Sequence, residues 1–263
     1  MNIIVCIKQV PDTANMHSLR INPETNTLMR DTAPAIINPF DENAIEEGIR
    51  LKEKYGGEVT VVSMGPLQVE KALRDSIAMG ADKAILLTDR AFAGSDTLAT
   101  SYTLAQAIKK IGKYDIILFG KQAIDGDTAQ VGPGVAEILG LPQITFVRKV
   151  EIENGKLTAE TALEDSFEVI EANLPCVLTV TKEINTPRYP SLKGIMRSKK
   201  AEIVMWGAKD IETDPERVGS KGSPTWVVRI FTPEMKSKGQ MLSGAPEEIV
   251  DMLVNSLRDR KVL

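Results

Sequence analysis

The chain has 263 residues, of which 43% are hydrophobic and 26% are charged, so it is long enough to bury the core of one large or two modest globular domains. Its formal net charge of -4 argues against a general surface for nucleic acid or for an anionic membrane. No apolar run approaches the roughly 20 residues that span a bilayer, and the N-terminus leads straight into a strand-like run rather than a signal peptide, so we expect a cytoplasmic protein.

Up to about Phe146, short β-branched runs alternate with helix-period segments, which predicts an α/β fold with a doubly wound, mainly parallel sheet. The predicted strands are Asn2–Ile7, Glu58–Ser63, Lys83–Leu87, Asp115–Phe119 and Gln143–Phe146. The predicted helices are one capped by Asp41 and stopped at Gly56, and then Gln68–Ala78, Thr97–Lys110 and Ala129–Leu139.

After Phe146 the pattern predicts a small antiparallel excursion, with strands at Val150–Ile152, Lys156–Ala159 and Phe167–Ile170. Leu174–Val180 reads as a buried strand that is a candidate to rejoin the main sheet.

The C-terminal third is less regular. The basic, Pro-containing run 185–200 predicts an ordered loop, and the Gly, Pro and Ser of 213–240 predict an extended arm. A helix is expected over 246–257, with Ile249, Leu253 and Leu257 on one face. We therefore expect an α/β domain over 1–210, which includes the 185–200 loop, followed by a C-terminal arm and helix over 211–263.

Cysteine and histidine are too few for several kinds of site. Cys6 and Cys176 lie in apolar runs and are expected to be reduced core thiols. His17 lies in a polar stretch and is expected in a solvated loop. A Cys/His zinc site and a histidine-based hydrolase are therefore not expected.

The unusual segments follow strand ends, where parallel sheets bind ligands. They are Lys8–Thr13, Ser63–Pro66, Thr88–Thr97 and Gly120–Gly134, joined by Asn38–Asp41. One pocket built from these loops is the hypothesis, and ordinary loop chemistry is the alternative for any one of them.

Neither a P-loop nor the common dinucleotide fingerprint is present. Two other runs can cradle phosphate. In Gly94–Thr100, Thr97 and Thr100 share a helical face, although a simple capping motif is the alternative. Gly120–Gly132 supplies three glycines and a hydroxyl, more than a turn requires. Its two aspartates stand two residues apart in a glycine-containing loop, which gives their carboxylates no fixed relation for acid–base catalysis.

Taken together, several motifs resemble the beta subunit of electron-transfer flavoproteins over nearly the whole chain. They are Cys6–Asp12, Asn38–Asp41, Ala78–Asp82, Gly120–Asp125 and Thr186–Tyr189, with Lys199-Lys200 downstream. Each is weak alone, but their order and spacing are specific. The resemblance implies an alpha-subunit partner that holds an FAD near the interface, with the C-terminal arm and helix of this chain packing on that subunit.

The resemblance also implies an adenine-nucleotide site. Many members hold AMP there as a structural ligand. A bifurcating subgroup instead holds a second FAD, which takes hydride from NADH and splits the electron pair between ferredoxin and the alpha-subunit flavin. This chain resembles that subgroup in Asp125–Pro133 and Gly94–Thr100; AMP-type members lack the second run and carry a bulkier residue in place of Gly126. The implied cofactor-binding residues are Cys6, Asn38, Asp41, Met64, Thr97, Thr100, Gly120, Gln122, Ala123, Ile124, Asp125, Gly126, Asp127, Thr128, Ala129, Gln130 and Val131.

Finally, the resemblance makes 185–200 a recognition loop for a dehydrogenase of acyl-CoA or lactate type. Its implied partner-binding residues are Arg188, Leu192, Lys193 and Arg197, with Leu192 as the apolar anchor. The alternatives are a non-bifurcating subunit with AMP, and a stand-alone adenine-nucleotide-binding module, which leaves the basic loop and the arm unexplained.

Overall fold

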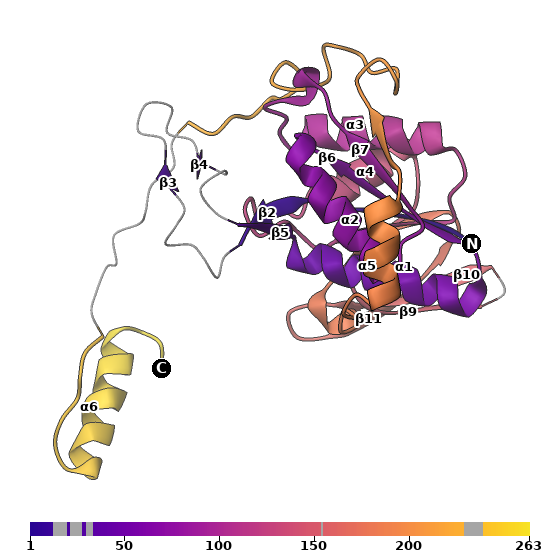
Figure 1. Cartoon of the computed structure of the whole chain (residues 1–263). Helices are drawn as coiled ribbons and strands as arrows, with labels where there is room; N and C mark the ends of the chain where they lie inside the picture. Colours follow the sequence, from indigo (N-terminus) through magenta and orange to yellow (C-terminus); the bar gives the residue numbers. More distant parts are fainter. Residues whose placement is uncertain (13–19, 22–27, 30–33, 154, 229–238) are drawn as a thin grey trace. The chain divides into compact units, whose positions relative to one another are not determined.

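A computed structural model describes residues 1–12, 20–21, 28–29, 34–153, 155–228 and 239–263 (Figure 1). His17 lies outside the described residues. The chain divides into two compact units, Met1–Val228 and Arg229–Leu263. Among the described residues, no helix is long and apolar enough to cross a membrane.

The first unit is built on a nine-stranded sheet of order β11-β10-β9-β12-β8-β1-β6-β7-β13. Its parallel strands are β1 (Asn2–Cys6), β6 (Glu58–Met64), β7 (Lys83–Leu87), β8 (Ile116–Gly120), β12 (Cys176–Val180) and β13 (Ile203–Trp206). At one edge, β9 (Gln143–Glu153) pairs parallel with β12 through its first residues and antiparallel with β10 (Lys156–Ala162), which in turn pairs antiparallel with β11 (Phe167–Asn173). Two small sheets pair β2 (Gln9–Pro11) with β5 (Ala35–Ile37), and β3 (Arg20–Ile21) with β4 (Leu28–Met29).

Helices cover both faces of the sheet because buried strand residues alternate between them. Ile3 and Val5 belong to the core that includes α1 (Pro39–Tyr55) and α2 (Glu70–Met79), whereas Ile4 and Cys6 belong to the core that includes α3 (Thr97–Ile111) and α4 (Val131–Leu139). In the described parts of the chain, the remaining helices are α5 (Leu192–Lys200), α6 (Pro246–Asp259) and the short 3₁₀ turns Leu67–Val69, Arg90–Phe92 and Lys182–Ile184. The predicted doubly wound α/β fold with an antiparallel excursion is confirmed.

Several local predictions need correction. Asp41 is not the N-cap of α1: Asn38 has the non-helical backbone, and Pro39, whose fixed φ suits a first helical position, begins the helix. The predicted break after Phe146 is wrong, because β9 continues through that residue with φ +56° and pairs with β12 and then β10. Helix α4 starts at Val131, two residues after the predicted start at Ala129.

The 185–200 segment is not only a loop, because its second half forms α5. β13 was not predicted at all. The residues that follow it are not simply an extended arm: Ile211 and Val218 are buried in the core beneath α3.

Candidate functional site

The topology places a switch point between β1 and β8. From β1 the chain passes to β6 and β7 on one side, and α3 then returns it to β8 on the other side of β1. Helices therefore leave in opposite directions from the carboxyl ends of β1 and β8, which is where open α/β sheets bind ligands. The predicted segments Lys8–Thr13 and Gly120–Gly134 both start at this point.

Asp41 joins the two strand ends at the switch point. Its Oδ2 accepts a hydrogen bond from the N–H of Lys8 at 2.7 Å, and its Oδ1 accepts one from the N–H of Gly120 at 3.1 Å. The residue is 6% exposed. Burial raises the pKa of this carboxyl to about 7, and the bonds from Lys8, Asn38 and Gly120 oppose the shift. Asp41 thus holds the backbone where the chain leaves β1 and β8.

Asn38 performs the same task one step further along the loop. Its Nδ2 donates to the carbonyl of Gln122 at 2.8 Å, and its Oδ1 accepts from the N–H of Ile124 at 3.1 Å. The side chain is fully buried, so both of its polar atoms are satisfied by the loop. Asn38 and Asp41 therefore shape the backbone that a ligand would meet.

The loop from Gly120 to Val131 is held at its rim by charged side chains. Lys8 Nζ lies 2.5 Å from Asp125 Oδ1, and the amide of Gln122 donates to the carboxylate of Asp127. Asp127 and Ala129 adopt φ of +54° and +53°. This left-handed backbone conformation is uncommon for residues with a Cβ, and residues that adopt it are often found at functional sites.

The predicted Gly120–Gly132 run contains three glycines with different roles, and the third, Gly132, lies in α4. A Cβ at Gly120 would lie 2.4 Å from Asp41 Oδ1, and one at Gly132 would lie 2.6 Å from the Cγ2 of Thr179, so these two serve the packing of the chain itself. At Gly126 no atom of the described residues, apart from chain neighbours, lies within 4 Å of the Cβ position. Gly126 is therefore the glycine that the chain's own packing leaves unexplained.

The N-terminus of α3 meets this loop through Thr97, whose hydroxyl donates to Gln130 Oε1 at 2.8 Å. Asp96 caps α3 by accepting from the N–H groups of Leu98 and Ala99, at 3.0 and 3.1 Å. Although burial opposes the shift, these bonds and those from Thr225 lower the pKa of Asp96. The predicted capping alternative is thus correct for Asp96. Thr97 lies beside Gln130, another of the predicted cofactor-binding residues.

A later segment, which was not predicted from the sequence, also reaches this helix end. The Thr225 hydroxyl and N–H donate to Asp96 Oδ2 at 2.8 and 3.1 Å, and the N–H of Asp96 donates to Ser223 Oγ at 2.8 Å. These partners are more than 120 residues apart in the chain, so local patterns carry no signal for the contact.

The remaining predicted cofactor-binding residues lie in the core, within α3 or in the loop. Cys6 is 3% exposed within the core that includes α3, and burial raises the pKa of its thiol far above the ordinary range. Met64 is half-buried at the end of β6 and packs on the same core. Thr100 lies one turn into α3 from Thr97. In the loop, Ala123 lies between Gln122 and Ile124, and Thr128 lies between the left-handed residues Asp127 and Ala129. The Cys6 thiol is thus a core group, as its apolar surroundings predicted.

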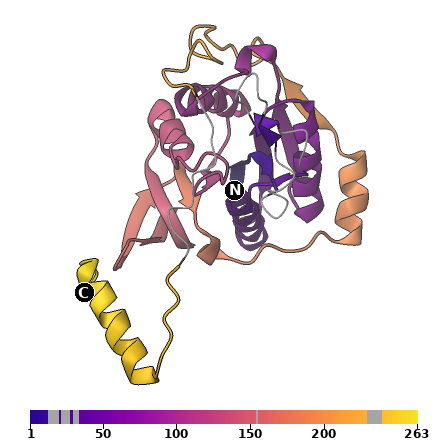
Figure 2. The ribbon, with the colours of Figure 1, turned by 90° about the vertical axis from the view of Figure 1, so that its left-hand side faces the viewer.

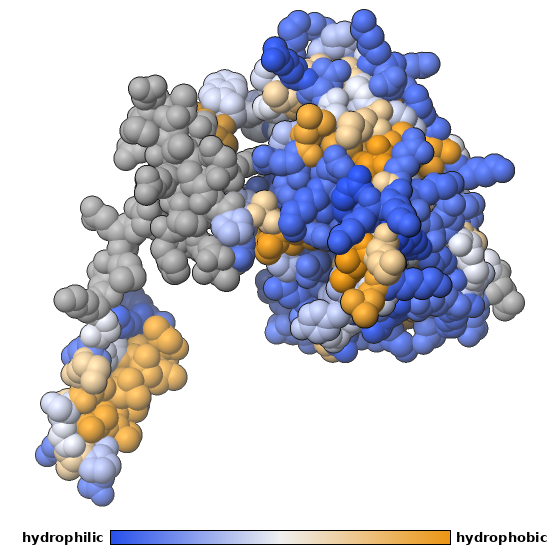
Figure 3. Space-filling view, in the orientation of Figure 1, coloured by the Kyte–Doolittle hydropathy of each residue, from blue (hydrophilic) through white to orange (hydrophobic). Residues whose placement is uncertain are grey.

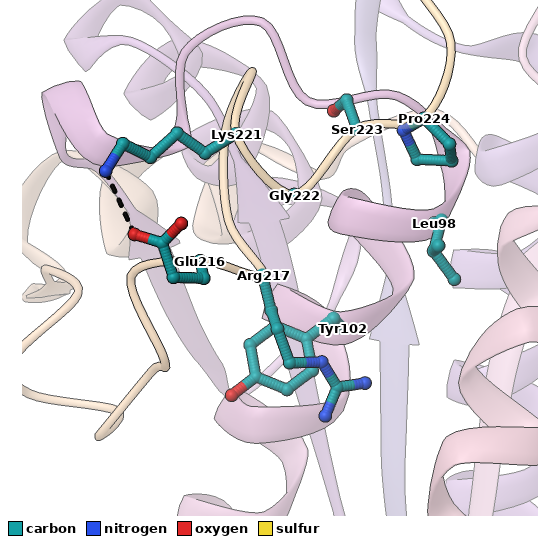
Figure 4. A pocket seen from close by; sticks show the side chains of 8 residues that line it. All are labelled: Leu98, Tyr102, Glu216, Arg217, Lys221, Gly222, Ser223 and Pro224. Carbon is teal, nitrogen blue, oxygen red and sulfur yellow. Dashed lines mark hydrogen bonds and ion pairs between the residues drawn. The ribbon is translucent and has the colours of Figure 1, made fainter.

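The described residues also line two surface recesses. One, of about 300 Å³, is lined by Leu98, Tyr102, Glu216, Arg217, Lys221, Gly222, Ser223 and Pro224 (Figure 4). In it the Arg217 guanidinium lies 4.1 Å from the centroid of the Tyr102 ring. The other, of about 550 Å³, lies between Asp89–Ala93 and the 208–221 segment. Neither contains a predicted cofactor-binding residue.

The predicted partner-binding residues lie on and before α5. Leu192 is 83% exposed, and Lys193 is exposed beside it. Arg188 instead pairs with Glu46 and Glu53 at 2.8 and 2.6 Å, and Arg197 donates to backbone carbonyls of the α2 end. Within the first unit, the two arginines therefore have structural partners, and their role in partner binding stays a prediction.

The second unit carries an apolar stripe along α6, visible in Figure 3. Val250, Met252 and Leu253 are 57%, 43% and 47% exposed. Of the predicted face, Leu253 is exposed, whereas Ile249 and Leu257 are half-buried. The packing of this face on another subunit stays a prediction.

Comparison with known proteins identifies similar chains. Residues 25–211 match the model of the electron transfer flavoprotein domain. The chain is 56% identical over 264 residues to the electron transfer flavoprotein subunit beta of Thermoanaerobacterium thermosaccharolyticum, with all of both chains covered, and 52% identical to that of Clostridium acetobutylicum, with 98% of each covered. It is also 47% identical over 265 residues to the caffeyl-CoA reductase-Etf complex subunit CarD of Acetobacterium woodii, with all of both chains covered.

Proposed function

The chain belongs to the electron transfer flavoprotein family as a beta subunit, and from this premise we propose that it binds an FAD of its own at the β1–β8 switch point. The coarser function, electron transfer together with an alpha subunit, follows from the family. The finer proposal is that the complex is bifurcating: NADH is the electron donor, and ferredoxin and an acyl-CoA dehydrogenase-type flavoprotein are the acceptors.

The observation that carries the proposal is the combination of Gly126 with the two left-handed residues beyond it. A left-handed backbone at Asp127 and Ala129 is costly, and the space around Gly126 is open. A glycine that is not needed for packing or for its own backbone angle fits a place where a ligand approaches the main chain closely. An FAD carries a second phosphate and a ribityl chain that AMP lacks, so it would need more hydrogen-bond donors and more room than AMP.

The residues divide into two sets in this proposal. Asn38 and Asp41 hold the loop backbone, and exposed groups at its surface, including Thr128 and Gln130, face the ligand. Thr97 supplies a hydroxyl at the N-terminus of α3, where the helix dipole favours anionic oxygens. The bound flavin would supply hydride acceptance and one-electron transfer, chemistry that no side chain provides.

The named relatives add one further argument. CarD is named as a subunit of a caffeyl-CoA reductase complex, which fits an acceptor dehydrogenase that acts on an acyl-CoA. We propose the same class of acceptor for this chain, docked on Leu192 and steered by the surrounding basic residues.

The test is to count the nucleotides released when the purified heterodimer is denatured. We expect two FAD per heterodimer and no AMP. One FAD and one AMP would overturn the bifurcating proposal and leave the simpler electron carrier. A colourless monomer that binds ATP would favour the stand-alone nucleotide-binding module.

A further inference from the structure

Helix α5 packs on the C-terminal end of α2 so closely that one position requires glycine. Figures 1 and 2 both show the two helices side by side. A Cβ at Gly194 would lie 2.1 Å from the carbonyl oxygen of Ala78, a backbone atom that cannot move aside as a flexible side chain can. The backbone φ of Gly194 is not in the left-handed region, so its lack of a side chain serves this contact alone.

Each of the two helices is capped by an arginine from the other. Arg197 of α5 donates to the carbonyls of Ile77 and Ala81, both at 2.7 Å, at the end of α2. Arg74 of α2 donates to the carbonyls of Ser198 and Ala201, at 2.6 and 3.2 Å, at the end of α5. The last carbonyls of a helix lack partners within it, so these bonds satisfy both ends at once.

The start of α5 is fixed as well. Ser191 Oγ accepts from the N–H of Gly194 at 3.0 Å as the N-cap. Before it, Arg188 donates in pairs to Glu46 and to Glu53, at distances between 2.6 and 3.1 Å. Glu46 is 2% exposed, so this anchor is largely buried on α1.

This firmly held helix exposes apolar side chains to solvent. Leu192 and Met196, one turn apart, are 83% and 65% exposed, and Tyr189 just before the helix is 96% exposed. A nine-residue helix with a glycine in it would be marginal in isolation. Its order therefore depends on the contacts with α2.

We propose that Gly194, Arg74 and Arg197 are positioning residues that hold α5 preformed on α2, so that the docking face is ordered before the dehydrogenase arrives. A preformed surface avoids the entropy cost of ordering a segment on binding. That the positioning of α5 serves dehydrogenase binding rests on the proposed function. That these residues hold α5 on α2 does not.

The decisive variant is Gly194→Ala in the heterodimer, because two effects predict opposite signs. Alanine is the better helix former and alone would slow amide exchange in α5. The clash with Ala78 predicts the reverse, an increase of about tenfold or more in hydrogen exchange at residues 192–200. The matched control is Lys200→Ala, at the exposed last position of α5, which should leave exchange there unchanged.

The second measurement is electron transfer from NADH to a purified acyl-CoA dehydrogenase, beside transfer to a tetrazolium dye. We expect Gly194→Ala to raise the KM for the dehydrogenase about tenfold and to leave dye reduction unchanged. Arg74→Met, which adds no volume, should act in the same direction and covers the case in which Gly194→Ala does not fold.

The outcomes separate the two claims. Exchange in α5 that is unchanged or slower in both variants overturns the proposed role of these residues in positioning the helix. Faster exchange with an unchanged KM shows that α5 is positioned for something other than the dehydrogenase, and it overturns the docking role itself.

Discussion

The switch-point site and the α5 surface use opposite chemistry. At the switch point, buried polar side chains point inward, and the chain's own backbone satisfies them, as with Asn38 and Asp41. On α5, Arg197 points inward and holds the helix on α2, while apolar side chains such as Leu192 face solvent beside exposed lysines.

Because of this difference, substitutions in the two regions should affect different properties of the protein. A substitution at the switch point removes internal hydrogen bonds, so it lowers stability and cofactor binding together. A substitution on the outer face of α5 removes no internal bond, so it lowers only the affinity for a partner. Measurements of stability and of transfer on the same variants therefore test the comparison.

The largest effect is expected for Asp41→Ala, which leaves the N–H groups of Lys8 and Gly120 without their acceptor. Each unpaired buried donor costs about 1–3 kcal/mol, so we expect the free energy of unfolding to fall by about 3 kcal/mol in urea titrations, with loss of bound nucleotide. The control is Asp89→Ala, because Asp89 also accepts from two backbone N–H groups but at an exposed site. Equal losses for the two variants would contradict the special role of burial at the switch point.

The next effect is expected for the double variant Thr97→Ala with Thr128→Ala. Losing a hydrogen bond to a charged oxygen costs about 1.5–3 kcal/mol, or roughly 10- to 150-fold in affinity. We expect one flavin to be depleted and NADH-dependent ferredoxin reduction to be lost, while the alpha-subunit flavin stays bound. Thr103→Ala is the control, since its hydroxyl bonds to the Ala99 carbonyl inside α3; it should lower stability but keep both flavins. Full flavin content in the double variant would refute the assigned roles of Thr97 and Thr128.

A smaller effect, confined to docking, is expected for Leu192→Ala. Truncating an apolar anchor at the centre of an interface costs about 1–2 kcal/mol, so the KM for an acyl-CoA dehydrogenase should rise about 5- to 30-fold. Flavin content and NADH oxidation by artificial acceptors should be unchanged. Leu67, 62% exposed in a separate 3₁₀ turn, offers the control Leu67→Ala, which should alter neither. Equal loss in both assays for Leu192→Ala would indicate a folding role instead.

The sequence predicted the sheet well because its signal is local. Each central strand is a largely apolar run, β-branched throughout in Val59–Val62, and each covering helix shows a 3.6-residue apolar period. The predicted Gly120–Gly134 segment also starts at the end of its strand as expected, and its last residues lie in α4. The sequence alone does not distinguish the roles of its glycines. Only the structure shows that a Cβ at Gly120 or Gly132 would clash with a neighbouring side chain.

The elements that were missed depend on contacts between distant residues. Helix α5 follows two prolines and contains Gly194, so local propensity favours a loop, and its stability comes from α2. The capping of α1 was assigned to Asp41 because aspartate is a good N-cap, but Asp41 instead binds the ends of β1 and β8. In each case a tertiary contact overrides a local preference.

The smallest effect is expected from the acid dependence of the Arg188 anchor. Although burial opposes the shift, the bonds from Arg188 and Arg50 lower the pKa of Glu46 below its usual value near 4.5. A lowered folded pKa means that this pairing stabilises the fold above the unfolded pKa and that the stabilisation is lost as the pH falls through the folded pKa. Because Arg188 is about one-third exposed, we expect a contribution of about 1 kcal/mol or less. The difference in unfolding free energy between the wild type and Arg188→Met should therefore be larger at pH 6 than at pH 3. A difference that does not shrink at low pH would show that Arg188 holds the start of α5 through its packing rather than through its charge.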